Sequence, residues 1–113
     1  MKISLKTLVN SFTSLKEVSG LKFTANRAFE IAKFLNKISE EMQTYEKIRM
    51  ETALKFSSDK KQVDENKMDS FLKEINELLI REIEIPDFHF TKQDFEGKDL
   101  TPEQIINLNW LIK

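Results

Sequence analysis

Few side chains of this sequence could do chemistry. The chain holds one histidine, His89, one tyrosine, Tyr45, and no cysteine. A histidine near Asp87 and Asp94 could serve as a general base or as a metal ligand. A solitary histidine outside any motif is more often a solvent-facing residue of its strand, and we favour that interpretation. The absence of cysteine excludes disulfides, thiolate nucleophiles and cysteine metal sites.

Paired carboxylates are the other candidates for acid–base or metal chemistry. Glu40–Glu41 and Glu82–Glu84 are such pairs, but they lie among lysines on faces that we expect to be solvated. The acidic residues around Gly97 lack the ligand spacing of a calcium loop, and there is no glycine-rich phosphate loop. We therefore predict a protein that is not an enzyme and that holds no cofactor and no metal ion.

Composition favours one soluble domain spanning residues 1–113. The chain is 40% hydrophobic and 33% charged, with nine phenylalanines, which is enough to build a core. No apolar run approaches the roughly 20 residues that cross a bilayer, so we expect no membrane contact. The net charge of −1 gives no support to a general affinity for nucleic acid.

Charge is unevenly spread along the chain. Residues 1–37 hold six Lys and one Arg against two Glu, a net of +5, and residues 82–113 hold seven acids against three Lys, a net of −4. A basic first third could bind nucleic acid, but its basic and apolar residues interleave at helical spacing rather than cluster. We expect it to pair instead with the acidic last third, in the same fold or in a neighbouring subunit.

Helices should dominate, because only two glycines and two prolines interrupt the sequence. Helical spacing predicts a short helix from Leu8 to Ser19 and a long helix over 25–55, and after a polar loop at 57–63 Asp64 should begin a second long helix. The apolar stripes of the two long helices are Ala28, Ile31, Leu35, Ile38, Met42 and Tyr45, and Met68, Phe71, Leu72, Ile75, Leu78, Leu79 and Ile83. We predict that they cover each other in an antiparallel hairpin rather than in a free-standing coiled coil.

Two stretches alternate apolar and polar residues with the period of a strand. They are residues 1–6 and 82–91, and we predict that they pair. Opposite charges would then meet on the wet face, where Lys2 and Lys6 stand against Glu82 and Glu84.

A capping box at Thr101 with Pro102 behind it predicts a C-terminal helix. The expected fold class is mainly α (α+β): an antiparallel long-helix hairpin, a short N-terminal helix, a C-terminal helix and a small two- or three-stranded sheet.

Several of these stretches carry a resemblance. Phe71–Leu79, Glu82–Ile85 and Leu100–Ile112, together with the Met1–Ile3 opening and Tyr45–Lys47, resemble small uncharacterised proteins of tailed bacteriophages and prophages of low-GC Gram-positive bacteria. The resemblance implies a small phage accessory protein in the host cytoplasm. It carries no catalytic signature, so no functional residue is transferred from it.

Two functions fit these expectations. The first is a non-enzymatic phage-encoded accessory protein that binds a host or phage protein and inhibits or redirects a host or defence protein. The second is a virion or tail assembly component that self-associates through its helices as a homo-oligomer. A small enzyme has the least support.

Candidate interface residues fall in three places. The flank of the long helix and the loop that follows it offer Tyr45, Arg49, Lys60 and Lys61, the segment 88–95 offers Phe88, Phe90 and Phe95, and the C-terminal helix offers Trp110. A lone tryptophan beside a terminus can anchor an interface, although burial in the core is the commoner outcome for it.

Overall fold

The computed structural model describes all of residues 1–113. In chain order its elements are strand β1 (Lys2–Ser4), helix α1 (Leu5–Ser19), helix α2 (Ala25–Lys55), the 3₁₀ turn η1 (Glu65–Lys67), helix α3 (Met68–Leu79), strand β2 (Glu82–Glu84), the 3₁₀ turn η2 (Lys92–Phe95), helix α4 (Pro102–Leu108) and the 3₁₀ turn η3 (Asn109–Leu111). The predicted fold class, mainly helical with a small antiparallel sheet, is confirmed. None of the helices has both the length and the apolar content that a bilayer crossing requires.

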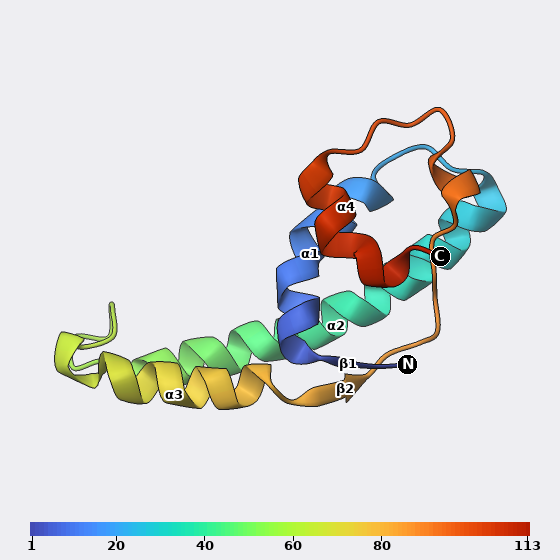
Figure 1. The fold of residues 1–113 in the computed structure, drawn as a ribbon. Helices are drawn as coiled ribbons and strands as arrows, with labels where there is room; N and C mark the ends of the chain where they lie inside the picture. The colour runs from blue at the N-terminus through green and yellow to red at the C-terminus, as the bar shows by residue number, and fades with distance from the viewer.

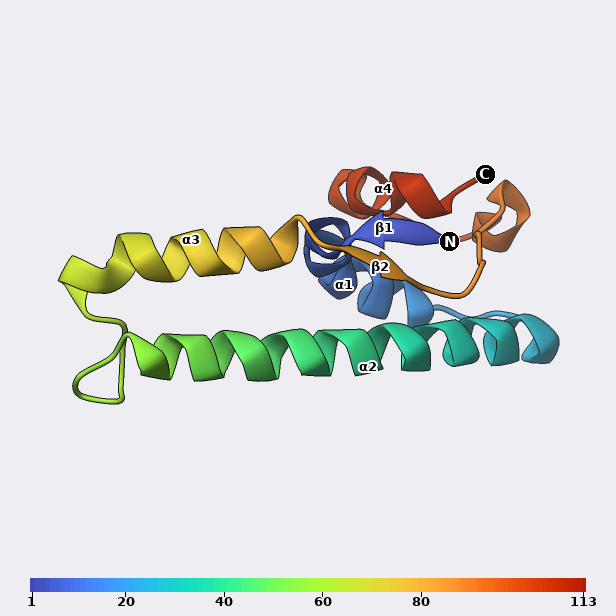
Figure 2. The same ribbon diagram turned by 90° about the horizontal axis from the view of Figure 1, so that it is seen from below.

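Helix α2 is the spine of the molecule (Figure 1). Its N-cap is Thr24, as predicted, whose hydroxyl accepts a hydrogen bond from the Arg27 backbone N–H. Helix α1 packs across the N-terminal half of α2, α4 packs on the other side of α1, and α3 runs antiparallel beside the C-terminal half of α2 (Figure 2). We call residues 46–80 the arm and the remainder the body. The projecting arm explains the elongated extents of 51 × 26 × 20 Å.

The main core is one cluster of fourteen buried residues, and every member lies in the body. The predicted stripe of α2 contributes Ile31, Ile38, Met42 and Tyr45, whereas Leu35 is half-buried and Ala28 is exposed. The remaining members are Leu5, Leu8, Leu15, Val18, Phe34, Ile85, Phe88, Phe90, Leu108 and Leu111. The stripe of α2 is thus covered mainly by α1 and by the C-terminal third of the chain.

The expectation that the two long-helix stripes cover each other along their length is wrong. Helix α3 has only 12 residues, about 18 Å at the helical rise of 1.5 Å per residue. It begins at the far tip and reaches only the C-terminal half of α2 (Figure 2). Phe71 and Ile75 of α3 are buried beside α2 but do not belong to the main cluster. Helices α2 and α3 do form a hairpin, but along the arm it consists of these two helices alone.

Strands β1 and β2 pair antiparallel, as predicted, with Ile3 opposite Ile83 and Lys2 opposite Glu84. Glu82 stands opposite Ser4 rather than Lys6. The reason is that Ser4 is the N-cap of α1: its hydroxyl accepts a hydrogen bond from Thr7 N at 3.1 Å, so the chain turns into a helix before Lys6.

The predicted strand over 82–91 ends early. Pro86 cannot donate a backbone hydrogen bond, and the ladder with the N-terminus stops at Ile85, whose N–H donates to Met1 O at 2.9 Å. Phe90 pairs elsewhere, in an isolated parallel bridge with Ile112. The third strand of the expected sheet is therefore replaced by one contact with the C-terminal end of the chain.

The two predicted helix starts in the second half of the chain have different outcomes. Thr101 forms the predicted capping box, with Thr101 N–H donating to Gln104 Oε1 at 3.0 Å and Gln104 N–H donating to Thr101 Oγ1 at 3.2 Å. Asp64 begins only the short turn η1, and its carboxylate makes no capping bond there. It accepts hydrogen bonds from the Ser58 N–H and hydroxyl instead, which closes the tip loop.

Candidate functional site

Three of the predicted interface residues are buried. Tyr45 is 6% exposed, Phe88 9% and Phe90 0%, and all three belong to the main core. Phe88 stacks on Phe34 of α2, with ring centroids 4.6 Å apart, and meets Phe90 edge-on at 5.0 Å. The expectation that these three side chains face a partner is wrong, because all three are packed in the core of the body.

Phe95 and Trp110 are half-buried and hold elements of the body together. Phe95 packs against Phe90 at 5.2 Å between ring centroids. The indole N–H of Trp110 donates to the hydroxyl of Ser11 in α1 at 2.8 Å. The commoner outcome for Trp110, packing within the fold, is therefore the one observed.

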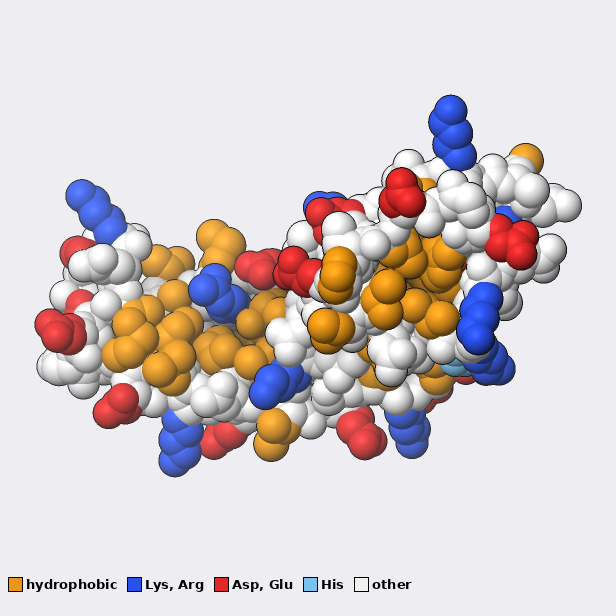
Figure 3. Space-filling model, turned by 45° about the horizontal axis from the view of Figure 1, so that its top comes forward, with side chains coloured by type: hydrophobic (Ala, Val, Ile, Leu, Met, Phe, Trp, Pro, Cys, Tyr) orange, Lys and Arg blue, Asp and Glu red, His pale blue; other side chains and the backbone are white.

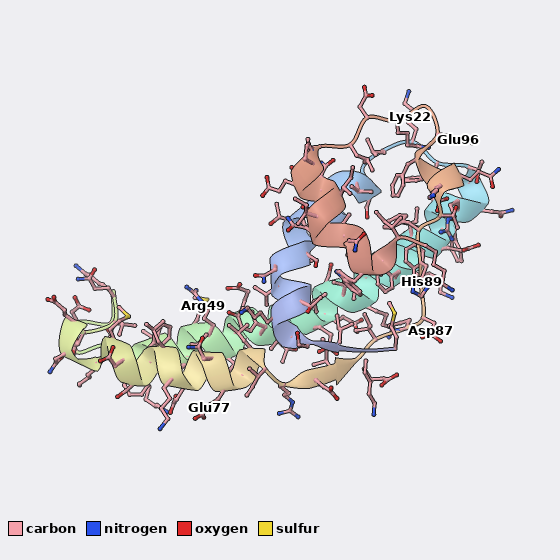
Figure 4. All side chains as sticks on the ribbon, viewed as in Figure 1. Lys22, Arg49, Glu77, Asp87, His89 and Glu96 are labelled. Atoms are coloured by element: carbon pink, nitrogen blue, oxygen red, sulfur yellow. The ribbon has the colours of Figure 1, made fainter.

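Arg49, Lys60 and Lys61 are exposed, and all three lie on the arm. Arg49 points to the side from which α1 and α4 rise above α2, and Glu77 points to the opposite side (Figure 4). No acidic group pairs with Arg49 in the chain. A role for these three residues in an interface stays a prediction.

The tip that presents the two lysines is built by acidic side chains. Asp59 Oδ1 accepts hydrogen bonds from the backbone N–H groups of Lys61 (2.9 Å) and Gln62 (3.2 Å) and from the Ser57 hydroxyl (2.9 Å). These bonds hold the pKa of Asp59 below its ordinary value. They also support Lys60 in the left-handed backbone region, at φ 60°. A hollow of about 230 Å³ lies between this loop and Met50, Ala53 and Leu54 of α2.

The residues suspected of chemistry are not gathered into a site. His89 is half-buried, and its backbone carbonyl accepts a hydrogen bond from Arg27 at 2.6 Å. No group of three or more His, Asp or Glu side chains could hold a metal ion. A surface hollow of about 660 Å³ lies between α2 and residues 86–88 and is lined by charges of both signs together with Phe34, Pro86 and Phe88.

Arg27 and Asp94 form a bidentate ion pair in the body. Arg27 Nε and Nη2 donate hydrogen bonds to the two carboxylate oxygens of Asp94 at 2.9 and 2.8 Å, and the guanidinium carbon lies 4.9 Å from the centre of the Phe88 ring. Burial alone would raise the pKa of Asp94, but hydrogen bonds from Arg27 and Thr91 outweigh it and hold that pKa below its ordinary value. This contact confirms the expected pairing of the basic first third with the acidic last third at one point. Because each charged group supplies hydrogen-bond partners to the other, the pair serves to hold the fold together, and we call it the latch.

The arm carries apolar residues that do not contribute to the core of the fold. The side of α2 that is buried at Ile38, Met42 and Tyr45 continues at three- and four-residue steps as Arg49, Thr52 and Phe56. The side of α3 that packs on the core at Leu79 continues backwards as Ile75, Leu72 and Met68. Ile75 is buried against α2, and we call the remaining residues, Arg49, Thr52, Phe56, Met68 and Leu72, the arm face.

Nothing in the chain covers the arm face. Helix α1 crosses α2 only over the body (Figure 1), and the arm face receives no third helix. Leu72 is 46% exposed and Met68 38% exposed, and a hydrophobic surface extends along the arm beside the body (Figure 3). Ile48, Met50, Leu54 and Ile80 are also exposed on the flanks of the arm. Exposed apolar surface of this extent is typical of a binding site.

Periodicity placed Met68 and Leu72 in the apolar stripe of the second helix but could not identify them as exposed. An apolar stripe at helical spacing indicates which side of a helix avoids water, but it does not indicate which other element packs on that side. The signal that could have found the arm face is the position of the loop: a hairpin that turns at 57–63 places the helix that begins at Met68 beside the C-terminal end of α2, and not beside the stripe at 28–45.

Comparisons of the chain with protein-family models, with curated proteins and with solved structures return no match. The function proposed below therefore depends on the arm face itself.

Proposed function

We propose that this protein is a non-enzymatic accessory protein that acts by binding another protein, and that the arm face is its binding surface. One observation carries the proposal: Leu72 and Met68 continue the side of α3 that packs on the body at Leu79, and on the arm they are exposed with no helix over them. A stripe that needs a neighbour and has none in its own chain is suited to a neighbour from another chain.

The arrangement of the arm supports a docking role in a second way. Its two helices are held together by Phe71 and Ile75, which are buried, and by an ion pair between Lys55 Nζ and Glu74 Oε1 at 2.7 Å. The arm therefore presents Met68 and Leu72 from a formed helix rather than from a flexible segment. A partner that binds a preformed surface loses less conformational entropy on docking.

The setting comes from the resemblance to small phage and prophage proteins. On that basis we propose that the protein works in the cytoplasm of a bacterial host, where it occupies or redirects a host or defence protein. The partner would place an apolar helix or ridge on the arm face, with acidic groups near Arg49.

A second candidate function is that of a virion or assembly component that self-associates. The distribution of charge on the arm favours it. Residues 46–61 hold five basic and three acidic side chains, a net of +2, and residues 62–80 hold two basic and five acidic ones, a net of −3. The first half of each arm is thus net basic and the second half net acidic, so a second copy would offer each half the opposite sign.

A photo-crosslinking residue tests the proposed function in cells that make the protein. It is placed at Leu72 on the arm face and, as a matched control, at Ile106, which is 74% exposed on α4 of the body. We expect one adduct of defined mass from Leu72 and none of comparable yield from Ile106. No adduct from Leu72, or equal adducts from both positions, would contradict the arm as the binding surface.

A further inference from the structure

We infer that the arm face is covered by the arm face of a second copy of this chain, in a two-fold dimer whose arms form a four-helix layer. The inference rests on the second candidate function, self-association, because it names the surface through which the copies meet; in the dimer the arm face is closed to a host protein. The stripe at 28–45 is not available for self-association, since the body already covers it.

The first argument is area. A compact monomer of 13.3 kDa exposes roughly 6,500 Å² by the scaling of surface with mass. This chain exposes 7998 Å², about 1,500 Å² more. A standard interface removes about 800 Å² from each partner. One contact of ordinary size on the arm would therefore remove about half of the excess.

Shape shows that the excess belongs to the arm. The radius of gyration is 16.8 Å, against about 13 Å for a compact domain of this length. The fourteen-residue core lies wholly in the body, and the arm buries only Phe71 and Ile75. Two more helices packed on the arm face would complete a four-helix layer of the usual kind.

The second argument is charge, which favours a second copy over an unrelated partner. The whole arm has eight acidic and seven basic side chains, a net of −1, so two arms do not repel each other strongly. The basic part of α2 in one copy can face the acidic α3 of its partner, and two-fold symmetry repeats that contact. Arg49, which has no ion pair within its own chain, lies on the basic side of this contact.

Sedimentation equilibrium of the full chain tests the inference. We expect the wild-type mass to rise with concentration from 13.3 kDa to twice that value. Leu72→Glu places a charge at the centre of the arm face and should weaken self-association at least roughly thirtyfold, the effect of losing one hot-spot residue. Ile106→Glu, at an exposed apolar position of the body, should leave the association unchanged.

Two results would overturn the inference. One is a wild-type chain that stays at 13.3 kDa at every concentration, and the other is a dimer that Leu72→Glu leaves intact. Circular dichroism of Leu72→Glu establishes that the variant is folded, which we expect because Leu72 is half exposed in the single chain. A monomer that still gives a Leu72 adduct with another protein would overturn the second copy while leaving the proposed function standing, whereas no adduct would remove both.

Discussion

Arg27, in the first turn of α2, holds Asp94 of η2 through two parallel hydrogen bonds, Nε to Oδ1 at 2.9 Å and Nη2 to Oδ2 at 2.8 Å. The same guanidinium donates to the backbone carbonyl of His89 at 2.6 Å and stands over the Phe88 ring. One side chain therefore contacts three residues of the segment 86–95 and, together with the buried rings of Phe88 and Phe90, holds the segment on the end of α2. The segment has no regular strand of its own beyond β2, so this contact replaces a sheet as its anchor.

Removing the carboxylate should destabilise the body. We expect Asp94→Ala to lower the free energy of unfolding by about 1.5–3 kcal/mol, because the half-buried guanidinium of Arg27 loses two charge-assisted hydrogen bonds. Urea denaturation measures the change. Glu30→Ala is the matched control: Glu30 also pairs with Arg27 but is 59% exposed, so the loss should stay within about 0.5 kcal/mol. Equal losses in the two variants would contradict the latch.

Stability should depend on pH through the same residue. The pKa of Asp94 is lower in the folded chain than its unfolded value of about 3.9, so the ionised form stabilises the fold. That contribution is complete above the unfolded pKa and is lost as the pH falls through the folded pKa. We expect the difference in unfolding free energy between wild type and Asp94→Asn to be constant from about pH 7 to 5 and to shrink below about pH 4. A difference that grows on acidification would have the wrong sign.

Ser11 is the polar centre of the contact between α1 and α4. It is buried, and its hydroxyl lies 2.6 Å from Thr7 O and 2.9 Å from Asn107 O while accepting the indole N–H of Trp110. We expect Ser11→Ala to cost about 1–3 kcal/mol, since it leaves that N–H without a partner. Urea denaturation followed by the fluorescence of Trp110, the only tryptophan, measures the loss. Thr13→Ala, on the exposed side of α1, should change stability by less than about 0.5 kcal/mol.

Phe90 and Phe29 separate core from surface. Phe90 is fully buried, and Phe90→Ala should lower the unfolding free energy by about 3–5 kcal/mol because it leaves a cavity among Phe88, Phe95 and Phe23. Phe29 is 66% exposed on α2, so Phe29→Ala should cost less than about 0.5 kcal/mol. Thermal and urea unfolding of the two variants test the assignment. A small loss of unfolding free energy for Phe90→Ala would contradict the assignment of Phe90 to the core and make it a candidate interface residue again.

Elements with local signals could be predicted from the sequence. The capping residues Thr24 and Thr101 and the alternation around Ile3 and Ile83 each act within a few residues, and each is found where expected. The end of β1 could also be read locally in retrospect, because Ser4 is followed by helical spacing from Leu5. Signals of this kind depend only on residues close together in the sequence, so they can be recognised without knowledge of the tertiary packing.

Relationships that join distant parts of the chain were not predictable in the same way. The stripe of α2 signalled a neighbour, but α1 and α3 both carry apolar stripes, and only packing decides which of them covers Met42. Phe88 and Phe90 flank a histidine and alternate like residues of an exposed strand, yet both are core. Arg27 and Asp94 are 67 residues apart, and charge imbalance alone indicated that some such pair would form.

The most direct test of the central claim, that a second copy covers the arm face, is amide hydrogen exchange of the full chain at dilute and at concentrated protein. We predict that the amides of Phe71–Leu79 in α3 exchange at least roughly tenfold more slowly in the concentrated sample, because burial of Met68 and Leu72 suppresses local opening. The amides of Leu8–Val18 in α1, whose cover is the same in both samples, should change far less. Identical exchange of α3 at both concentrations would contradict the account.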